Sequence, residues 1–462
     1  MATSPSKDPQ TFLANLRQSG LLSDDQWASL SDRLPQTDRA KVVARALVQQ
    51  GVLTKFQAEQ ILSGRTQGFV LGQYRIIDEL GKGGMGRVFK AIHQTMNRVV
   101  ALKVLAPQLV ETEKARHLFQ REMRAVAQLM HPNLVTAYDA NQIGNRFYLV
   151  MEYVDGPNLD HLVRKHGPLP VGLACELMRQ AAEGLQYAFE MGMVHRDIKP
   201  SNILVVPPAD EPRRKRHVVK ILDFGLARLQ NSEEDAQEVG TILTRPNMVM
   251  GTPDYVSPEQ ARNLHSVDIR SDLYSLGCTF YFLLTGRVPF PDGGTLEKLI
   301  RHTTEEPEAI ERLRPDVQPE VRAIVRRLTA KEPAVRFQTP AELAAALEPF
   351  AVDTAGWPPS PEGSIAQENL APHAPVEEGL HTPLPGVQSD GELQFSPTEE
   401  ASALINTLAP DVSPTLLSGT RYVSVARSRV SQAERRRLKV AIAVAVAVVA
   451  GLVGLAAMLA VF

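Results

Sequence analysis

Two short stretches of the sequence carry side chains that could transfer a phosphoryl group. Residues 194–202 read VHRDIKPSN, in which Asp197 and Asn202 are five positions apart and Pro200 prevents a regular helix. Residues 221–226 read ILDFGL, an apolar strand that ends at Asp223. Phosphoryl transfer to a hydroxyl needs a carboxylate that orients the nucleophile, and Asp197 can supply it. It also needs oxygen ligands for Mg²⁺, which Asn202 and Asp223 can supply.

A glycine-rich stretch lies nearer the N-terminus. Residues 80–88 read LGKGGMGRV, a G-x-G-x-x-G-x-V pattern with glycines at positions 81, 83 and 86. Glycine permits the tight backbone path with which main-chain N–H groups can cover phosphates. A dinucleotide-binding turn should open a helix, whereas the segments RVFKAI and RVVALKVL that follow are typical of β-strands. The pattern therefore favours a glycine loop within a β-hairpin.

A lysine and a glutamate follow the glycine loop. Lys103 ends a V-A-L-K run on the second of these strands, where it could meet phosphate oxygens or remain a solvated strand lysine. The helical stretch of residues 111–130 carries Glu122, a candidate to pair with Lys103, although other acids of that helix would also fit the periodicity. Each pattern alone could arise by chance. Together, their order and spacing exclude coincidence.

In this order, the glycine loop, the V-A-L-K lysine, HRDIKPSN and DFG resemble the protein kinase catalytic domain, specifically the bacterial eukaryotic-type (Hanks-type) serine/threonine kinases. The resemblance covers residues 74–350. It implies an α+β, two-lobed protein-kinase fold with a small β-rich N-lobe and a large helical C-lobe. It also implies transfer of the ATP γ-phosphate to serine and threonine hydroxyls of proteins, with Mg²⁺, or Mn²⁺ in its place, as the metal.

The resemblance assigns a role to each of these side chains. Lys103 would contact the α- and β-phosphates and pair with Glu122 of the helix that follows. Asp197 would be the catalytic aspartate, and Lys199 would be the cation near the γ-phosphate. The metal ligands implied in the same way are Asn202 and Asp223.

The resemblance also implies a nucleotide pocket. Met151 would be the gatekeeper, and the hinge from Glu152 to Val154 would hold adenine through its backbone. The implied ATP-contacting residues are Leu80, Gly81, Lys82, Gly83, Gly84, Met85, Gly86, Arg87, Val88, Ala101, Lys103, Met151, Glu152 and Val154.

Further implied features concern regulation and support. Residues 257–259, Ser-Pro-Glu, stand for the A-P-E motif, with Glu259 bridging to Arg336, and Asp272 would brace the catalytic loop. Serine/threonine specificity follows from Lys199 in DIKPSN and Thr252 in GTPDY. Because Arg196 precedes the catalytic aspartate, phosphate on residues 223–259 is expected to balance it. The candidate autophosphorylation sites are Thr241 and Thr244.

The segments outside this domain differ in composition. Residues 1–66 have capping-box spacing at Ser23 with Gln26 and at Thr54 with Gln57, which predicts a small all-helical module of unassigned function. Residues 351–420 are rich in Pro, Gly, Ser and acids and poor in aromatics, which is typical of a disordered linker. Such a linker would act as a flexible tether.

Residues 440–462 are an uncharged apolar run. At about 1.5 Å per residue the run can cross a hydrocarbon core of roughly 30 Å, so we expect a transmembrane helix rather than a buried core helix. The preceding basic segment, residues 421–439, has seven basic residues and one acid, a net charge of +6. Because the whole chain has a net charge of −2, the residues outside this segment carry a net charge of −8. The positive-inside bias then predicts a single-pass, tail-anchored membrane protein with its catalytic domain in the cytoplasm.

Ala447 and Gly451 have small-xxx-small spacing, which would let two such spans pack as a homodimer.

Whole-chain composition excludes several classes. With 462 residues, 44% hydrophobic and 22% charged, the chain is long enough for several folded units and is neither wholly disordered nor collagen-like. The net charge of −2 gives no general attraction to nucleic acid, so none is expected as a partner. Cys175 and Cys278 lie too far apart in sequence for metal-ligand spacing and predict two buried thiols in a reducing compartment.

Three rival functions stay open at this point. The chain could be an idle scaffold with a kinase fold, a kinase of small molecules, or a receptor-like sensor. The four catalytic residue types argue against the first. The segment GTPDYVSPEQ, suited to docking a peptide, argues against the second.

The basic run at residues 213–216 is either a solvated hairpin tip or a docking site for an acidic partner.

Overall fold

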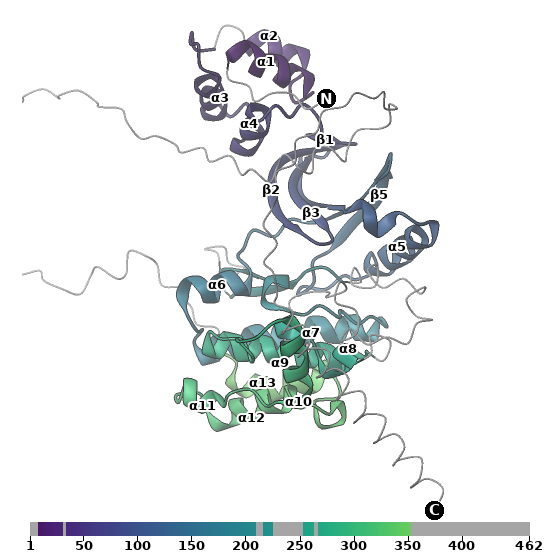
Figure 1. Cartoon of the computed structure of the whole chain (residues 1–462), viewed down its shortest axis with the longest axis vertical. Coiled ribbons are helices and arrows are strands. Elements are labelled where there is room, and N and C mark those ends of the chain that lie inside the picture. Colours follow the sequence, from purple (N-terminus) through teal and green to yellow (C-terminus); the bar gives the residue numbers. More distant parts are fainter. Residues whose placement is uncertain (1–7, 31–33, 209–215, 225–252, 263–266, 353–462) are drawn as a thin grey trace, which may run out of the picture. The chain divides into compact units, whose positions relative to one another are not determined.

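The computed structural model describes residues 8–30, 34–208, 216–224, 253–262 and 267–352 (Figure 1). Thr241, Thr244 and Thr252 lie outside these residues, as do most of the basic run at 213–216 and the predicted linker, basic segment and transmembrane run. Within the described ranges, no helix is both long enough and apolar enough to cross a bilayer.

Four helices open the described chain. Asp8 caps the first by accepting a hydrogen bond from the N–H of Thr11 at 2.9 Å, and Thr54 caps the fourth through a reciprocal capping box with Gln57. Their apolar faces meet in one cluster whose central side chains, such as Phe12 and Leu47, have no exposed surface. The helices are α1 (Pro9–Gln18), α2 (Asp24–Leu30), α3 (Ala40–Gln49) and α4 (Lys55–Leu62).

A six-stranded antiparallel sheet follows, with the order β1-β2-β3-β4-β6-β5. Because side chains alternate along a strand, Leu102 and Val150 face one cluster while Ala101 and Met151 face the main core on the other side. The strands are β1 (Val70–Leu71), β2 (Tyr74–Gly83), β3 (Gly86–His93), β4 (Arg98–Leu105), β5 (Ala137–Ile143) and β6 (Arg146–Glu152).

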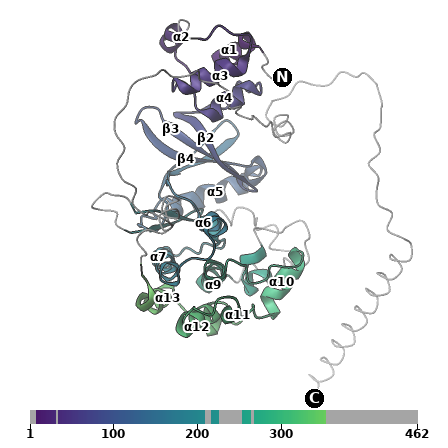
Figure 2. The same cartoon turned by 90° about the vertical axis from the view of Figure 1, so that its left-hand side faces the viewer.

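Helix α5 (Glu113–Val126) packs against this sheet through its apolar side (Figure 2). Thr112 caps the helix, and Phe119, Met123 and Val126 are buried one turn apart. The ring of Phe119 meets that of Phe147 edge-on, with centroids 5.5 Å apart. The helix is therefore amphipathic, with one apolar stripe against the sheet and the other side toward water.

The rest of the described chain is mostly helical. Helices α7 (Val171–Glu190) and α9 (Ile269–Thr285) form its centre, and α9 is buried along nearly its whole length. Because α9 is enclosed on nearly every side, close packing makes it a rigid support for the residues that it carries. Cys175 and Cys278 lie on these two helices, and burial raises the pKa of each thiol to about 12.

Shorter elements surround this pair. The two-stranded hairpin of β7 and β8 contacts the middle of α7, where Gln180 bonds to the backbone of His217 and Val219. The remaining α-helices and strands of the described chain are α6 (Leu159–His166), β7 (Ile203–Val206), β8 (Val218–Ile221), α8 (Pro258–Arg262), α10 (Thr295–Thr304), α11 (Ile310–Leu313), α12 (Pro319–Leu328) and α13 (Pro340–Leu347). Short 3-10 helices occur at η2 (Pro107–Val110), η3 (Pro200–Asn202), η7 (Pro253–Tyr255), η9 (Pro333–Val335) and η10 (Glu348–Phe350).

A buried ion pair ties α8 to the C-terminal part of this helical region. The guanidinium of Arg336, with no exposed surface, donates to both carboxylate oxygens of Glu259 at 2.6 and 2.9 Å. It also donates to the carbonyls of Arg270, Ala330 and Lys331. Burial alone would raise the pKa of Glu259, but the hydrogen bonds and charge of Arg336 outweigh it and lower that pKa below 4.5. The predicted bridge is confirmed.

Glu259→Gln should lower the free energy of unfolding by about 3 kcal/mol near pH 7, because the buried charge of Arg336 loses its partner. The folded-state pKa of Glu259 is depressed, so its contribution is present above its unfolded value and is lost as the pH falls through the folded value. Urea unfolding at pH 7 and near pH 4 should therefore show a smaller difference from wild type at the lower pH.

The matched control is Glu342→Gln, because Glu342 meets Arg327 at 3.8 Å with both side chains nearly half exposed. An exposed pair should contribute less than about 1 kcal/mol at either pH. A loss at Glu259→Gln no larger than this control would contradict the importance of the buried pair.

Candidate active site

Asp272, on α9, holds the backbone that carries Asp197. Its carboxylate is 1% exposed and accepts hydrogen bonds from the N–H groups of His195 and Arg196, both at 2.7 Å. Burial raises the pKa of Asp272, against the opposing pull of His195 and the two N–H groups. Arg196 is held at φ +70°, a strained value for a residue other than glycine. The predicted bracing of the catalytic loop is confirmed.

His195 connects this loop to the segment that carries Asp223. Its Nε2 lies 2.6 Å from the carbonyl oxygen of Leu222, and its ring meets that of Phe224 edge-on, with centroids 4.5 Å apart. The imidazole has no exposed surface. Sequence reasoning assigned no role to His195, although its place before Arg196 and Asp197 was visible. The structure thus adds it as a support between two site segments.

Two predicted site residues, Lys199 and Asn202, converge at Asp197. The ammonium of Lys199 donates to its two carboxylate oxygens at 3.0 and 2.8 Å. The side-chain amide of Asn202 donates to the carbonyl and to one carboxylate oxygen of Asp197, at 2.9 and 3.0 Å. These bonds use the nitrogen of the Asn202 amide, and its oxygen remains as the part that can accept or ligate. The loop therefore presents a carboxylate, a cation and an amide oxygen together.

Asp223 lies next to this group and pairs with Lys103. The N–H of Leu222 donates to the carbonyl of Asn202 at 2.9 Å, which places the two predicted metal ligands on adjoining backbone. Asp223 adopts φ +64°, a second strained residue at the site. Its carboxylate lies 2.8 Å from the ammonium of Lys103, which is 4% exposed.

The predicted ion pair between Lys103 and Glu122 is not formed in this structure. Among the described residues, the carboxylate within 4 Å of the Lys103 ammonium is that of Asp223. Glu122 is buried on α5, and its carboxylate lies 3.6 Å from Arg121 of the same helix. The physical reason is that the turn at Asp223 directs a nearer carboxylate at the lysine.

The glycine loop joins β2 to β3 as a hairpin, with Gly83 opposite Gly86. Gly86 has φ +135°, and an added Cβ there would lie 2.0 Å from the carbonyl oxygen of Val104. A Cβ at Gly81 or Gly83 would meet nothing within 4 Å. The predicted contacts lie on β2 (Leu80, Gly81, Lys82, Gly83), in the turn (Gly84, Met85) and on β3 (Gly86, Arg87, Val88).

The predicted gatekeeper and hinge lie at the end of β6. Met151 is 5% exposed and pairs with Ala101 across β4 and β6, so both side chains face the main core beside Lys103. The carboxylate of Glu152 accepts a hydrogen bond from Lys220 at 2.9 Å. Sequence reasoning missed this bond, which ties the hinge to β8 and so to the segment before Asp223. Val154 follows, partly buried.

Sequence comparison gives the family. Residues 74–346, more than half of the chain, match the protein kinase domain. The chain belongs to this family, and the predicted protein-kinase fold is thereby confirmed.

The chain is 39% identical to the serine/threonine-protein kinase pkn3 of Myxococcus xanthus over 267 residues, which cover 57% of this chain and 47% of that protein. It is 34% identical to the serine/threonine-protein kinase PknB of Mycolicibacterium smegmatis over 387 residues, 82% of this chain and 55% of that protein. It is 36% identical to PknB of Mycobacterium tuberculosis over 279 residues, 60% of this chain and 42% of that protein. The chain thus spans about half the length of the relatives it matches.

Gly86→Ala should destabilise the folded chain by about 3 kcal/mol, because the methyl group collides with a backbone carbonyl at a left-handed φ. Gly83→Ala should change the free energy of unfolding by less than about 0.5 kcal/mol, because its methyl group enters open space. Denaturant unfolding of the two variants measures the difference. Equal stabilities would show that the backbone path at Gly86 is not as tight as described.

Proposed function

We propose that the chain is a protein serine/threonine kinase that transfers the γ-phosphate of ATP to protein hydroxyls. The observation that carries the proposal is the contact of Asp197 with both Lys199 and Asn202, next to the ion pair of Asp223 with Lys103. Membership of the protein kinase family supports it, as does the similarity to the serine/threonine-protein kinases pkn3 and PknB. A scaffold without activity would not need these four side chains together.

Each side chain has a role in this proposal. Asp197 orients the substrate hydroxyl and takes its proton as the bond to phosphorus forms. Lys199 neutralises charge on the transferring oxygens. Lys103 holds the nucleotide phosphates, and its pairing with Glu122 remains a prediction for the nucleotide-bound enzyme. Because the transition state is loose and dissociative in character, position and charge matter more than the basicity of Asp197.

The donor set suits a magnesium ion. Mg²⁺ prefers oxygen ligands and is held in such enzymes by one or two protein side chains together with substrate phosphates. The amide oxygen of Asn202 and the carboxylate of Asp223 are of this kind and lie on adjoining backbone. When bound, the ion would neutralise phosphate charge. Mn²⁺ has similar ligand preferences and could replace it.

The adenine site in this proposal lies between the glycine loop and the hinge. The backbone from Glu152 to Val154 would hold the base, and Ala101, Val88 and Met151 would supply apolar contacts. The loop itself would cover the phosphates.

The regulation and placement of the enzyme are proposed from sequence. Thr241 and Thr244 are proposed as autophosphorylation sites, and residues 440–462 as a membrane anchor that keeps the catalytic domain at the cytoplasmic face. Packing of two anchors through Ala447 and Gly451 would favour phosphorylation in trans. The substrates are proteins.

Asp197→Asn should reduce transfer of labelled phosphate to a generic protein substrate by about 100-fold or more, because the amide lacks the negative charge and has only one oxygen with which to orient the substrate hydroxyl. The variant should still be folded at the assay temperature, because asparagine has nearly the same shape and Lys199 keeps some exposure to water. The control is Asp316→Asn, since the Asp316 side chain is 65% exposed and its ion-pair partner among the described residues is the neighbouring Arg314. Transfer by Asp197→Asn at the wild-type rate would refute the proposed catalytic role.

Membrane anchoring has a separate test. The full chain, expressed in a bacterium, should sediment with membranes and resist extraction by alkaline carbonate, because a span of this length is removed only by detergent. A chain that stops at residue 420 should stay in the supernatant. Extraction of the full chain by carbonate would show that residues 440–462 do not span the bilayer.

A further inference from the structure

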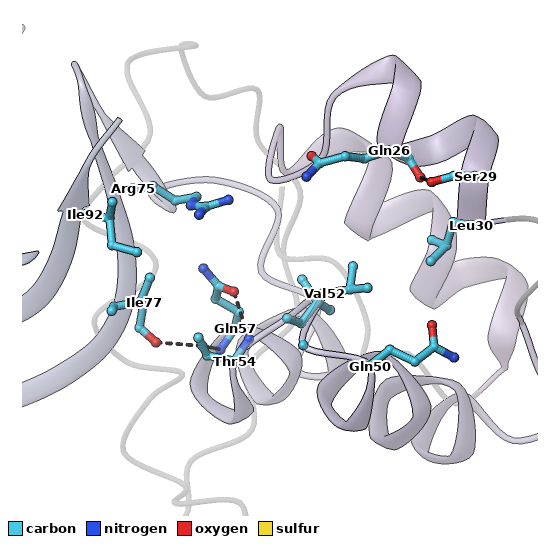
Figure 3. Close-up of a pocket in the computed structure, with 12 residues that line it drawn as sticks. Gln26, Ser29, Leu30, Gln50, Val52, Thr54, Gln57, Arg75, Ile77 and Ile92 are labelled. Carbon is cyan, nitrogen blue, oxygen red and sulfur yellow. Dashed lines mark hydrogen bonds between the residues drawn. The ribbon is translucent and has the colours of Figure 1, made fainter. Parts of the chain in front are cut away.

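The capping box of α4 also binds the sheet. Within the box, the N–H of Gln57 donates to the Thr54 hydroxyl at 3.2 Å, and the N–H of Thr54 donates to the Gln57 side chain at 3.0 Å. Each side chain has a further donor that reaches β2. The Thr54 hydroxyl donates to the carbonyl of Ile77 at 2.6 Å (Figure 3). The Gln57 amide donates to the carbonyl of Ile76 at 2.7 Å. We call Thr54 and Gln57 the β2 latch.

The β2 latch meets β2 at an irregularity in the strand. Ile76 pairs with Ala91 and Asp78 pairs with Lys90, so Ile77 is an extra residue without an opposite partner on β3. A bulge of this kind interrupts the ladder and leaves backbone groups to be satisfied in another way. The hydroxyl of Thr54 supplies that hydrogen bond to the Ile77 carbonyl. The latch therefore fixes the strand at the first of the two irregularities in its pairing with β3, the second of which lies between Glu79 and Gly81.

Helix α4 also touches β3, the other strand of the glycine hairpin. The ring of Phe56 lies against that of Phe89, with centroids 6.5 Å apart. Arg87, two residues before Phe89, packs over the same ring and pairs with Glu79 of β2 at 2.5 Å. One helix thus contacts both strands whose ends form the glycine loop.

The seam beside the β2 latch is not filled by side chains. A hollow of about 450 Å³ lies there, bordered by residues of α2, of the segment before α4 and of β2 (Figure 3). One of its walls is Arg75, whose buried Nε has no hydrogen-bond partner among the described residues. An unfilled space gives no packing energy. At this edge the latch and the Phe56 contact therefore carry the attachment between α4 and the sheet.

We propose that Thr54 and Gln57 are positioning residues for the nucleotide. By holding β2 at its bulge, the latch keeps the glycine loop, which ends the same strand at Gly83, in the shape that covers the phosphates. This inference rests on the proposed function, in which that loop binds ATP. An unlatched strand occupies the competent shape for only part of the time, and the apparent dissociation constant rises by the inverse of that fraction.

Gln57→Glu separates the latch from the cap. Glutamate is a regular capping-box residue at this helix position, so its carboxylate still accepts from the N–H of Thr54. It cannot donate to the Ile76 carbonyl and places a negative charge against it. We expect the dissociation constant for ATP and the KM for ATP to rise about threefold or more, with kcat changed less than about twofold. Amide exchange at residues 76–83 should accelerate.

The matched control is Gln26→Glu. Gln26 forms the same capping box with Ser23 at the start of α2, at 3.0 and 3.3 Å, and within the described part of the chain its side chain makes no hydrogen bond to the sheet. Its variant should bind ATP as wild type does. If Gln57→Glu does not fold, Thr54→Val, which removes the hydroxyl without adding charge, carries the same expectation, and Thr54→Ser should restore binding.

Wild-type ATP binding and wild-type exchange in Gln57→Glu would overturn the inference. An equal loss of ATP binding in Gln26→Glu would also overturn it, because the effect would then come from charge on the helices in general. A wild-type chain that neither binds nor uses ATP would refute the proposed function instead, and the exchange of residues 76–83 would still decide whether the latch orders β2.

Discussion

The arrangement of the site depends on one buried carboxylate. Asp272 is part of α9, which is enclosed on all sides, and it accepts the N–H groups of His195 and Arg196 at 2.7 Å. Two short bonds to consecutive N–H groups force Arg196 into a left-handed conformation, and that turn sets the direction in which Asp197 leaves the loop. The ring of His195 in turn contacts the carbonyl of Leu222, which holds the backbone next to Asp223. Two loops are fixed from a single rigid helix.

The charges of the site are paired with one another. Lys199 forms an ion pair with Asp197, and Lys103 forms one with Asp223. Partly buried charges are costly unless opposite charges or hydrogen bonds accompany them, so each pair allows the other residues to stay charged in the fold. The same groups are those that a phosphate chain and a divalent cation would meet. The site is therefore held together by interactions that its proposed ligands can replace.

The sequence was most informative where chemistry is local or where the order of motifs is strict. The capping boxes at Ser23 and Thr54, the hairpin around the glycines and the bridge from Glu259 to Arg336 all occur as predicted. The capping boxes and the hairpin follow from neighbouring residues, whereas the bridge from Glu259 to Arg336 was expected from the family resemblance. Family membership followed from the same motifs.

Other features depend on distances that spacing does not reveal. Lys103 pairs with Asp223 rather than Glu122, because the choice between two carboxylates is made by the turn at Asp223 and the position of α5. The bond from Lys220 to Glu152 and the bonds from the capping box of α4 to β2 join segments whose sequences give no sign of contact. The capping box already accounts for Thr54 and Gln57 at the start of α4, so the sequence offered no reason to expect their additional hydrogen bonds to β2.

The most direct test of the central constraint is the rate of phosphoryl transfer by Asp272→Asn, measured in single turnover with saturating ATP at a temperature at which the variant is folded. The asparagine side chain has the same size as aspartate but only one oxygen that can accept a hydrogen bond. Its NH₂ group would face the second backbone N–H, donor against donor, so that one of the two hydrogen bonds is lost. The rate should fall by about 100-fold, as expected when a reacting group is displaced by about 1 Å, while ATP affinity changes less than about twofold. A folded variant that transfers phosphate at the wild-type rate would contradict the dependence of the site on Asp272.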